Sequence, residues 1–199
     1  MTDYTEDNTM EDLFGPLEDT NNPPKGLSLH KHALNNTQLN QMLQFIKDQN
    51  WFNELKSRNQ VMKFGELDSI FEPLDTIGFD NLPHSICSRY PLFDQLIAND
   101  YQPGEGLIPH IDLARFMDGI LIATLLGTCI MEFTNDFYKY SVFLEPGDVV
   151  ILTDESRYQW KHGIPARTFD TIDGKDIHRT RRISITLRKM ILDDHGISS

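Results

Sequence analysis

The sequence has few cysteines and no long hydrophobic run, and both features narrow the class of protein. Only two of the 199 residues are cysteine, Cys87 and Cys129, and their spacing matches no metal or redox motif. Two free thiols favour a reducing compartment, so we expect the cytoplasm, the nucleus or both. No run reaches the roughly 18 apolar residues of a membrane-spanning helix. The polar first residues also predict no secretion signal.

Basic residues are in the minority. The chain has 18 Lys and Arg against 30 Asp and Glu, a formal net charge of −12, which opposes extensive phosphate binding. The charge is uneven, however, because residues 1–24 contain seven acids and no base. Residues 154–189 instead hold nine Lys and Arg against five Asp and Glu. The acidity therefore weakens the case for a nucleic-acid partner without excluding it, and no membrane partner is expected.

The acidic N-terminal segment is expected to lie outside the folded domain. Residues 1–26 are polar, contain three prolines and offer little apolar surface to offset the entropy of ordering. We therefore predict a mobile tail over 1–26 and a single domain over 27–199. The pair Leu13 and Phe14 leaves open that this tail recruits a partner rather than only solubilising the chain.

The hydrophobic pattern predicts a mainly β fold with one flanking N-terminal helix. Residues 37–49 have apolar positions at helical spacing, with Thr37 as the expected N-cap. Short β-rich runs follow, separated by Gly, Pro and Asp turns. The expected strands cover 61–64, 92–98, 120–126, 129–133, 138–144, 149–152 and 183–187. Many short strands without intervening long helices indicate a jelly roll, or double-stranded β-helix, in an α+β chain.

Two segments carry residues suited to binding a metal. In an extended chain His110 and Asp112 project from the same face, so an imidazole and a carboxylate converge. His162 lies 50 residues further on and is the candidate for a third ligand. Two histidines and one carboxylate form the facial triad of non-haem iron oxygenases, which leaves coordination positions open.

A polar stripe lies on the strand expected near the C-terminus. From Arg182 to Arg188, polar and apolar residues alternate strictly. Arg182, Ser184, Thr186 and Arg188 share one face. The plain interpretation is a strand with one solvated face. The functional interpretation is a pocket wall whose guanidinium groups bind carboxylates.

These candidate residues, together with the segments around them, resemble the AlkB family of Fe(II)- and 2-oxoglutarate-dependent dioxygenases. The segments Asn99-Asp100-Tyr101-Gln102-Pro103-Gly104 and Ile108-Pro109-His110-Ile111-Asp112 are similar to its Asn-x-Tyr-x-x-Gly and Ile-x-x-His-x-Asp motifs. The strand from Arg182 to Arg188 is similar to its Arg-x5-Arg strand. The segment around His162 resembles the subgroup that contains the tRNA wobble-uridine hydroxylases. The likeness covers about residues 58–190.

This resemblance implies a role for each matching residue. His110, Asp112 and His162 would bind Fe(II). Arg182 would pair with the distal carboxylate of 2-oxoglutarate, with Tyr101 and Asn99 as hydrogen-bonding partners. Ser184 and Arg188 complete the expected cosubstrate face, and Arg188 lies towards the reacting end. The implied reaction consumes O2 and yields succinate, CO2 and either a hydroxylated or a demethylated product.

The substrate is less well defined than the chemistry. Arg157, Arg167 and Lys175 are the expected substrate contacts in the basic segment. The stretch 66–89 is acidic and poor in aromatic residues, although a flipped base needs stacking partners. The leading hypothesis is a modified nucleic acid, with tRNA favoured over DNA. The alternatives are a basic protein tail such as a histone and, in another class, a non-catalytic binding module on the same fold.

Overall fold

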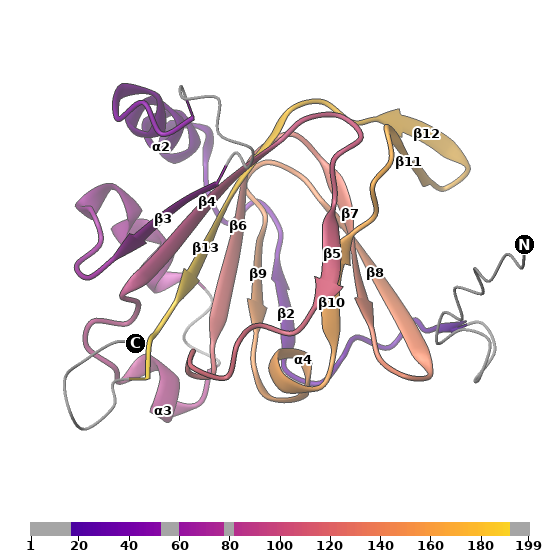
Figure 1. Ribbon diagram of the computed structural model, residues 1–199, viewed down its shortest axis with the longest axis horizontal. Helices are drawn as coiled ribbons and strands as arrows, with labels where there is room; N and C mark the ends of the chain where they lie inside the picture. Colours follow the sequence, from indigo (N-terminus) through magenta and orange to yellow (C-terminus); the bar gives the residue numbers. More distant parts are fainter. Residues whose placement is uncertain (1–16, 53–59, 78–81, 192–199) are drawn as a thin grey trace, which may run out of the picture.

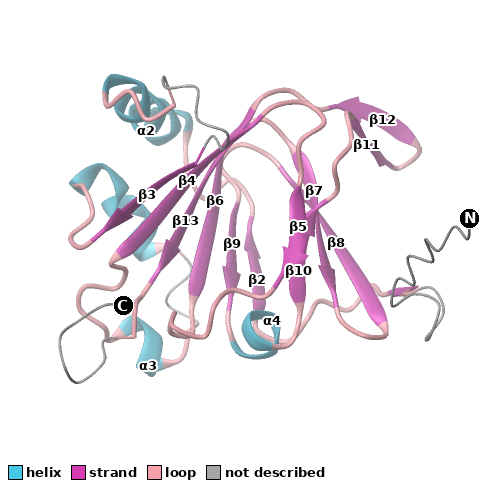
Figure 2. Ribbon diagram, in the orientation of Figure 1, coloured by secondary structure: helices cyan, strands magenta, loops and turns pink. Residues whose placement is uncertain are grey.

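The chain folds into two facing β-sheets with helices on the outside of one sheet, as the computed structural model shows (Figures 1 and 2). The structure describes residues 17–52, 60–77 and 82–191. The larger sheet has the strand order β2-β9-β6-β13-β4-β3, and the smaller has the order β1-β8-β7-β10-β5. A separate hairpin, β11-β12, projects beyond them. The predicted jelly roll is confirmed.

The larger sheet contains six strands, most of them rich in β-branched and other apolar residues. Their bounds are β2 Leu27–His30, β3 Gln60–Phe64, β4 Gln95–Tyr101, β6 Ile120–Leu126, β9 Val149–Leu152 and β13 Arg182–Arg188. In the order given above, every neighbouring pair in this sheet is antiparallel.

The smaller sheet contains five strands. Their bounds are β1 Glu18–Asp19, β5 Leu107–His110, β7 Cys129–Thr134, β8 Tyr138–Leu144 and β10 Lys161–Ile164. Strand β5 ends the sheet order, and an edge position tolerates Pro109, which has no N–H to donate to a neighbour. The hairpin strands are β11 Phe169–Ile172 and β12 Lys175–His178.

The helices lie at the ends and on the outer face of the sheets. They are α2 Asn36–Asp48, the 3-10 helix η1 Ser69–Thr76, α3 His84–Cys87 and α4 Asp154–Tyr158. Helix α2 confirms the predicted N-terminal helix, but Thr37 is not its cap. Asn35 is the N-cap. Its side chain accepts a hydrogen bond from the Gln38 main-chain N–H, and the Gln38 side chain accepts one from the Asn35 main-chain N–H. None of the described helices has the length and hydrophobicity that crossing a bilayer requires.

The alternation of β13 divides the core into two clusters. Ile183, Ile185 and Leu187 belong to a cluster that also contains Met42 and Ile46 of α2. A second cluster fills the space between the sheets, and it includes residues of β6, β7, β8, β9 and β10. The polar residues of β13 face away from α2 and line a pocket. The stripe therefore forms a pocket wall, as the functional interpretation expected, while the binding of carboxylates there stays a prediction.

The segment predicted as a tail differs from the expectation in its second half. Residues 1–16, which include Leu13 and Phe14, lie outside the described residues. Within 17–26, Glu18 and Asp19 pair with β8 in parallel, and the carbonyl of Gly26 accepts from the Thr153 N–H. The ordered chain thus begins before residue 27. The reason is that these bonds use main-chain groups, which an estimate based on side-chain hydrophobicity does not count.

Candidate active site

Three predicted metal ligands meet between the two sheets. His110 ends β5 and lies opposite His162 of β10 in the antiparallel register, with ring centroids 4.5 Å apart. Asp112 follows two residues after the end of β5. One potential ligand atom from each residue lies within 4.8 Å of the other two. The predicted convergence of His110, Asp112 and His162 is thus confirmed.

The protonation of the two imidazoles suits a divalent cation. His110 Nδ1 lies 2.9 Å from the carbonyl oxygen of Ile108, and a carbonyl only accepts, so Nδ1 carries the proton and Nε2 is free to bind. Burial lowers the pKa of His162 to about 4, with the Asp112 carboxylate opposing that shift in part. The His162 ring is therefore neutral at pH 7, as metal coordination requires.

The carboxylate of Asp112 has two oxygens in different situations. Its Oδ1 pairs with the Arg188 guanidinium, while its buried Oδ2 has no hydrogen-bond partner within the described chain. Oδ2 lies 3.6 Å from His162 Nε2, too far for a hydrogen bond. A buried carboxylate oxygen without a partner is costly. The atom therefore fits a metal ion, and two imidazoles with one carboxylate oxygen fit Fe(II).

The residues predicted to bind the cosubstrate lie on two neighbouring strands, β4 and β13. In the β4–β13 register Arg182 lies opposite Tyr101 and Ser184 opposite Asn99. On the other side of β13, Ser184 lies opposite Thr124 of β6. Tyr101, Asn99, Arg182, Ser184 and Arg188 all line the same pocket as His110 and His162. The structure thus brings these predicted residues together.

Arg182 is buried without a carboxylate partner among the described residues. It is 3% exposed, and its guanidinium lies 5.5 Å from the centre of the Tyr101 ring. Its hydrogen bond goes to a neutral group, the Thr124 hydroxyl, over 3.0 Å. A buried cation without an anion is unfavourable. The site therefore fits a carboxylate that a ligand supplies.

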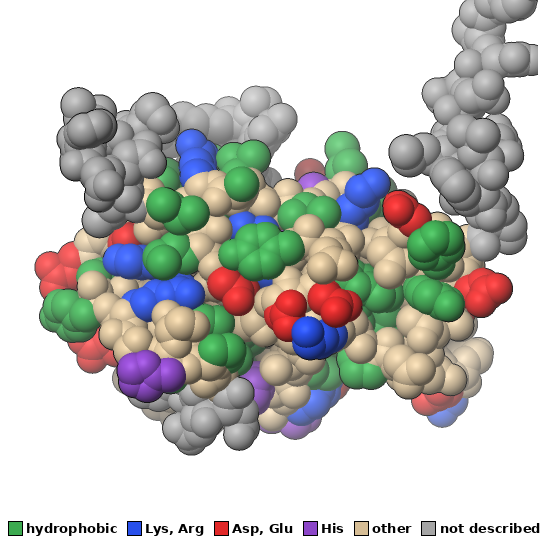
Figure 3. Space-filling view, turned by 90° about the horizontal axis from the view of Figure 1, so that it is seen from below, with side chains coloured by type: hydrophobic (Ala, Val, Ile, Leu, Met, Phe, Trp, Pro, Cys, Tyr) green, Lys and Arg blue, Asp and Glu red, His purple; other side chains and the backbone are tan. Residues whose placement is uncertain are grey.

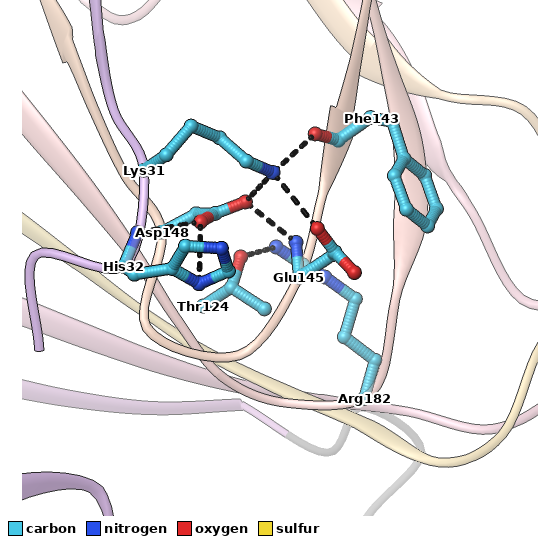
Figure 4. A network of polar contacts seen from close by, with 7 residues as sticks. All are labelled: Lys31, His32, Thr124, Phe143, Glu145, Asp148 and Arg182. Carbon is cyan, nitrogen blue, oxygen red and sulfur yellow. Dashed lines mark hydrogen bonds and ion pairs between the residues drawn. The ribbon is translucent and has the colours of Figure 1, made fainter. Parts of the chain in front are cut away.

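A polar network behind Thr124 supports this arginine (Figure 4). The Thr124 N–H donates to the main-chain carbonyl of Asp148, in the turn between β8 and β9. The Asp148 carboxylate is fully buried, and it accepts from the N–H groups of His32 and Glu145 and from the Lys31 ammonium. Thr124 was not predicted as a site residue. Its position as the only hydroxyl in the apolar run 120–126 is the sequence signal that could have identified it.

Two bases in the expected substrate set occupy different surroundings from those predicted. Arg157 is 2% exposed and donates to main-chain carbonyls, so it does not face a substrate. Arg167 is partly exposed and binds Asp170 over 2.7 Å. Arg179 shares this carboxylate, and the two arginines lower the pKa of Asp170 although burial opposes them. Lys175 is exposed on β12, as a substrate contact needs.

Comparison with known proteins agrees with this geometry. The profile of the 2OG-Fe(II) oxygenase superfamily matches residues 8–188. The uncharacterized protein L905 of Acanthamoeba polyphaga mimivirus is 34% identical over 183 residues, which cover 83% of this chain and 85% of L905. The alkylated DNA repair protein ALKBH8 homolog of Arabidopsis thaliana is 37% identical over 154 residues. That match covers 64% of this chain and 43% of the relative.

Other matches cover smaller shares or show the fold alone. The tRNA (carboxymethyluridine(34)-5-O)-methyltransferase ALKBH8 of Macaca fascicularis is 34% identical over 52% of this chain, but only 16% of its own length is covered. The structure of OsALKBH1 superposes with a TM-score of 0.53 at 18% identity, covering 85% of this chain and all of that one. A viral collagen prolyl hydroxylase from Paramecium Bursaria Chlorella virus-1 gives 0.58 at 11%, over 84% and 97%.

The superfamily uses Fe(II), 2-oxoglutarate and O2, and the residues described above fit the first two. The matched profile spans most of the chain, the triad converges, and its two histidines line one pocket with the buried arginine. This chain is therefore a member of the 2OG-Fe(II) oxygenase superfamily, an AlkB-like 2-oxoglutarate-dependent dioxygenase.

Proposed function

We propose that the enzyme hydroxylates or oxidatively demethylates a modified nucleic acid, with tRNA favoured over DNA. The observation that carries the substrate class is the similarity of 33–37% to ALKBH8 proteins, whose names refer to tRNA and to alkylated DNA. The likeness to prolyl hydroxylases is 11–15% in sequence and supports the fold alone. Since this chain spans 43% and 16% of two of those relatives, their full activities are not assumed for it.

The described residues divide the work between two ends of the pocket. His110, Asp112 and His162 hold Fe(II), which when bound supplies the chemistry that couples 2-oxoglutarate decarboxylation to oxidation of a substrate C–H bond. Arg182 binds the distal carboxylate, because its guanidinium is buried and lacks an anion. The overall reaction converts 2-oxoglutarate, O2 and R–H into succinate, CO2 and R–OH.

The remaining pocket residues orient the cosubstrate and exclude water. The hydroxyl of Tyr101 and the side chains of Asn99 and Ser184 lie beside Arg182 in the β4–β13 register. Apolar residues complete the wall, namely Ile97, Leu107, Ile122, Met131 and Ile164. Where these residues exclude water, the ionic contact of Arg182 with a carboxylate becomes stronger. An N-methyl group, once hydroxylated, is a hemiaminal whose C–N bond breaks to give N–H and formaldehyde, and this is how hydroxylation becomes demethylation.

Charge leaves a second substrate class open. The net charge of −12 favours a basic protein tail. On the face that carries α3 and α4, acidic, basic and hydrophobic side chains are mixed (Figure 3). Several arginines of the basic segment are also neutralised by acids, as Arg167 and Arg179 are by Asp170. We therefore expect phosphate contacts to be few, so that binding is weak and decreases with salt.

A non-catalytic binding module is the alternative from another class. The complete triad and the buried Arg182 argue against it, since neither a partnerless Asp112 Oδ2 nor a buried cation without an anion stabilises a fold. Absence of succinate in the presence of Fe(II), 2-oxoglutarate and every polymer tested would favour the module.

One experiment separates these hypotheses. Succinate release is measured with bulk tRNA, methylated single-stranded DNA and Lys-rich histone peptides, each at two salt concentrations. The proposal expects stimulation by tRNA that decreases with salt. Lys175→Glu should reduce that stimulation and leave uncoupled decarboxylation unchanged, because Lys175 is exposed on the hairpin. Arg167→Glu should do the same but also repel Asp170. Stimulation by the peptides alone would overturn the nucleic-acid assignment.

A further inference from the structure

The segment that carries Asp112 has little regular structure of its own. Between the end of β5 and the start of β6, residues 111–119 form neither helix nor extended strand. One side of the segment is tied to the chain after β13, where the Met117 N–H donates to the Lys189 carbonyl and Phe116 forms a bridge with Met190. These contacts lie four or more residues after Asp112. Something else must hold the main chain at Asp112 itself.

Arg157 of α4 supplies that contact. Its Nη1 donates to the Asp112 carbonyl over 3.0 Å, and its Nη2 donates to the carbonyls of Leu113 over 2.8 Å and Phe116 over 3.1 Å. The side chain is 2% exposed and is among the largest fully buried ones. One guanidinium thus fixes three carbonyls that lie 41 to 45 residues away in sequence.

The choice of an arginine follows from the acceptors. A planar guanidinium with several N–H donors can bind three carbonyls at once, whereas an ammonium is a compact point charge. Arg157 forms no ion pair with a carboxylate in the described part of the chain, and the Tyr158 ring lies 4.7 Å from its guanidinium carbon. A buried arginine that binds only carbonyls stabilises a fold poorly, since desolvation opposes it.

We propose that Arg157 is a positioning residue for the metal site, which holds the Asp112 main chain so that the carboxylate faces the two histidines. Its location makes this effective. Arg157 lies five residues before His162, so one short segment supplies a metal ligand directly and fixes another through its carbonyl. The side chain of Asp112 is held by Arg188 and its main chain by Arg157. The Asp112 carboxylate is thus already positioned before the metal binds.

The inference rests on the triad as a divalent cation site, and Mn(II) titration without cosubstrate tests the two separately. Wild-type protein should bind Mn(II), and His110→Ala should abolish binding. If wild type does not bind, the metal site itself fails. If it does, Arg157→Met should weaken Mn(II) affinity roughly 10- to 100-fold, the effect of removing partners that orient metal ligands. Arg157→Lys should be intermediate.

Arg179→Met is the matched control. Arg179 is also buried and also binds a main-chain carbonyl, that of Pro165, but it has a carboxylate partner, Asp170. The Arg179→Met variant should have a lower melting temperature and an unchanged Mn(II) affinity. Limited proteolysis should cleave Arg157→Met within 111–119 and spare the control. An Arg157→Met protein that loses only melting temperature would overturn the proposal. Failure of both Arg157 variants to fold would also overturn it, because the residue would then serve the fold.

Discussion

The two ends of β13 place an arginine on the same face of the sheet, yet the two guanidinium groups have opposite surroundings. Arg188 pairs with Asp112, and it lies 4.8 Å from the centre of the Phe116 ring. Arg182 binds the Thr124 hydroxyl and has no acidic partner in the described residues. Burial lowers the pKa of Arg188, and Asp112 opposes that shift. Arg188 thus neutralises an acid of the protein itself, whereas Arg182 remains available for a carboxylate that a ligand supplies.

The largest expected effect is loss of a metal ligand. His110→Ala or Asp112→Ala should reduce Fe(II)-dependent succinate release by about three orders of magnitude or more, because each removes one of three ligands that fix the ion. His178→Ala serves as the control, since His178 is exposed on β12. Retained turnover in either ligand variant would show that the cluster does not hold the metal.

Replacing Arg188 and replacing Arg182 should change the free energy of unfolding by different amounts. In metal-free protein, Arg188→Met leaves the Asp112 carboxylate buried without its partner, and we expect a loss of about 3–5 kcal/mol in the free energy of unfolding. Arg182→Met removes a cation that has no anion, so its effect should be near zero or stabilising. Urea unfolding of both variants measures this. Equal losses would remove the distinction between the two ends.

Acid should destabilise the metal-free protein through His162. Its folded-state pKa of about 4 lies below the unfolded value near 6.5, so between these values only the unfolded state takes up the proton. The contribution of neutral His162 to the free energy of unfolding is fully present above pH 6.5. It decreases by roughly 3 kcal/mol as the pH falls towards 4. His162→Gln lacks this proton uptake. The difference in unfolding free energy between the two proteins across this window gives the contribution, and a constant difference would contradict the burial of a neutral imidazole.

Thr124→Val should have the smallest effect. The variant removes the one hydroxyl that orients Arg182 and keeps the shape of the side chain. A single hydrogen bond contributes about 1 kcal/mol, so the KM for 2-oxoglutarate should rise roughly fivefold while kcat is unchanged. Thr171→Val on the hairpin is the control. An unaltered KM would mean that Tyr101 and the strand register alone position the guanidinium.

Sequence patterns predicted the regular parts of the fold and the direct ligands. The bounds of β6, β8 and β9 agree with the prediction, since runs rich in apolar and aromatic residues between turn residues define them. Strands β5 and β10 were not predicted, because four residues containing Pro109 or Gly163 show no alternation. Their pairing brings His110 and His162 together. Residue types, rather than strand periodicity, suggested that pair, and the resemblance to the AlkB family gave it a role.

Residues that act through main-chain groups were beyond sequence reasoning. Arg157 was expected among substrate contacts because a base in a basic segment is usually exposed. Its actual acceptors are carbonyls, which every residue carries and no pattern distinguishes. The pairing of Glu18 with β8 was missed for the same reason. Asp112 and Arg182 were predicted because their side chains carry the chemistry.

Titration of 2-oxoglutarate into anaerobic, Mn(II)-loaded protein tests the central claim most directly. The account predicts that Arg182→Met weakens 2-oxoglutarate binding by 2–5 kcal/mol, roughly 30-fold to several thousandfold, since a buried charge pair loses one partner. Arg181→Met is the adjacent control, because Arg181 is exposed and binds Asp100 instead of lining the pocket. Unchanged affinity in the Arg182 variant, or an equal loss in the Arg181 variant, would contradict the assignment of Arg182 as the cosubstrate anchor.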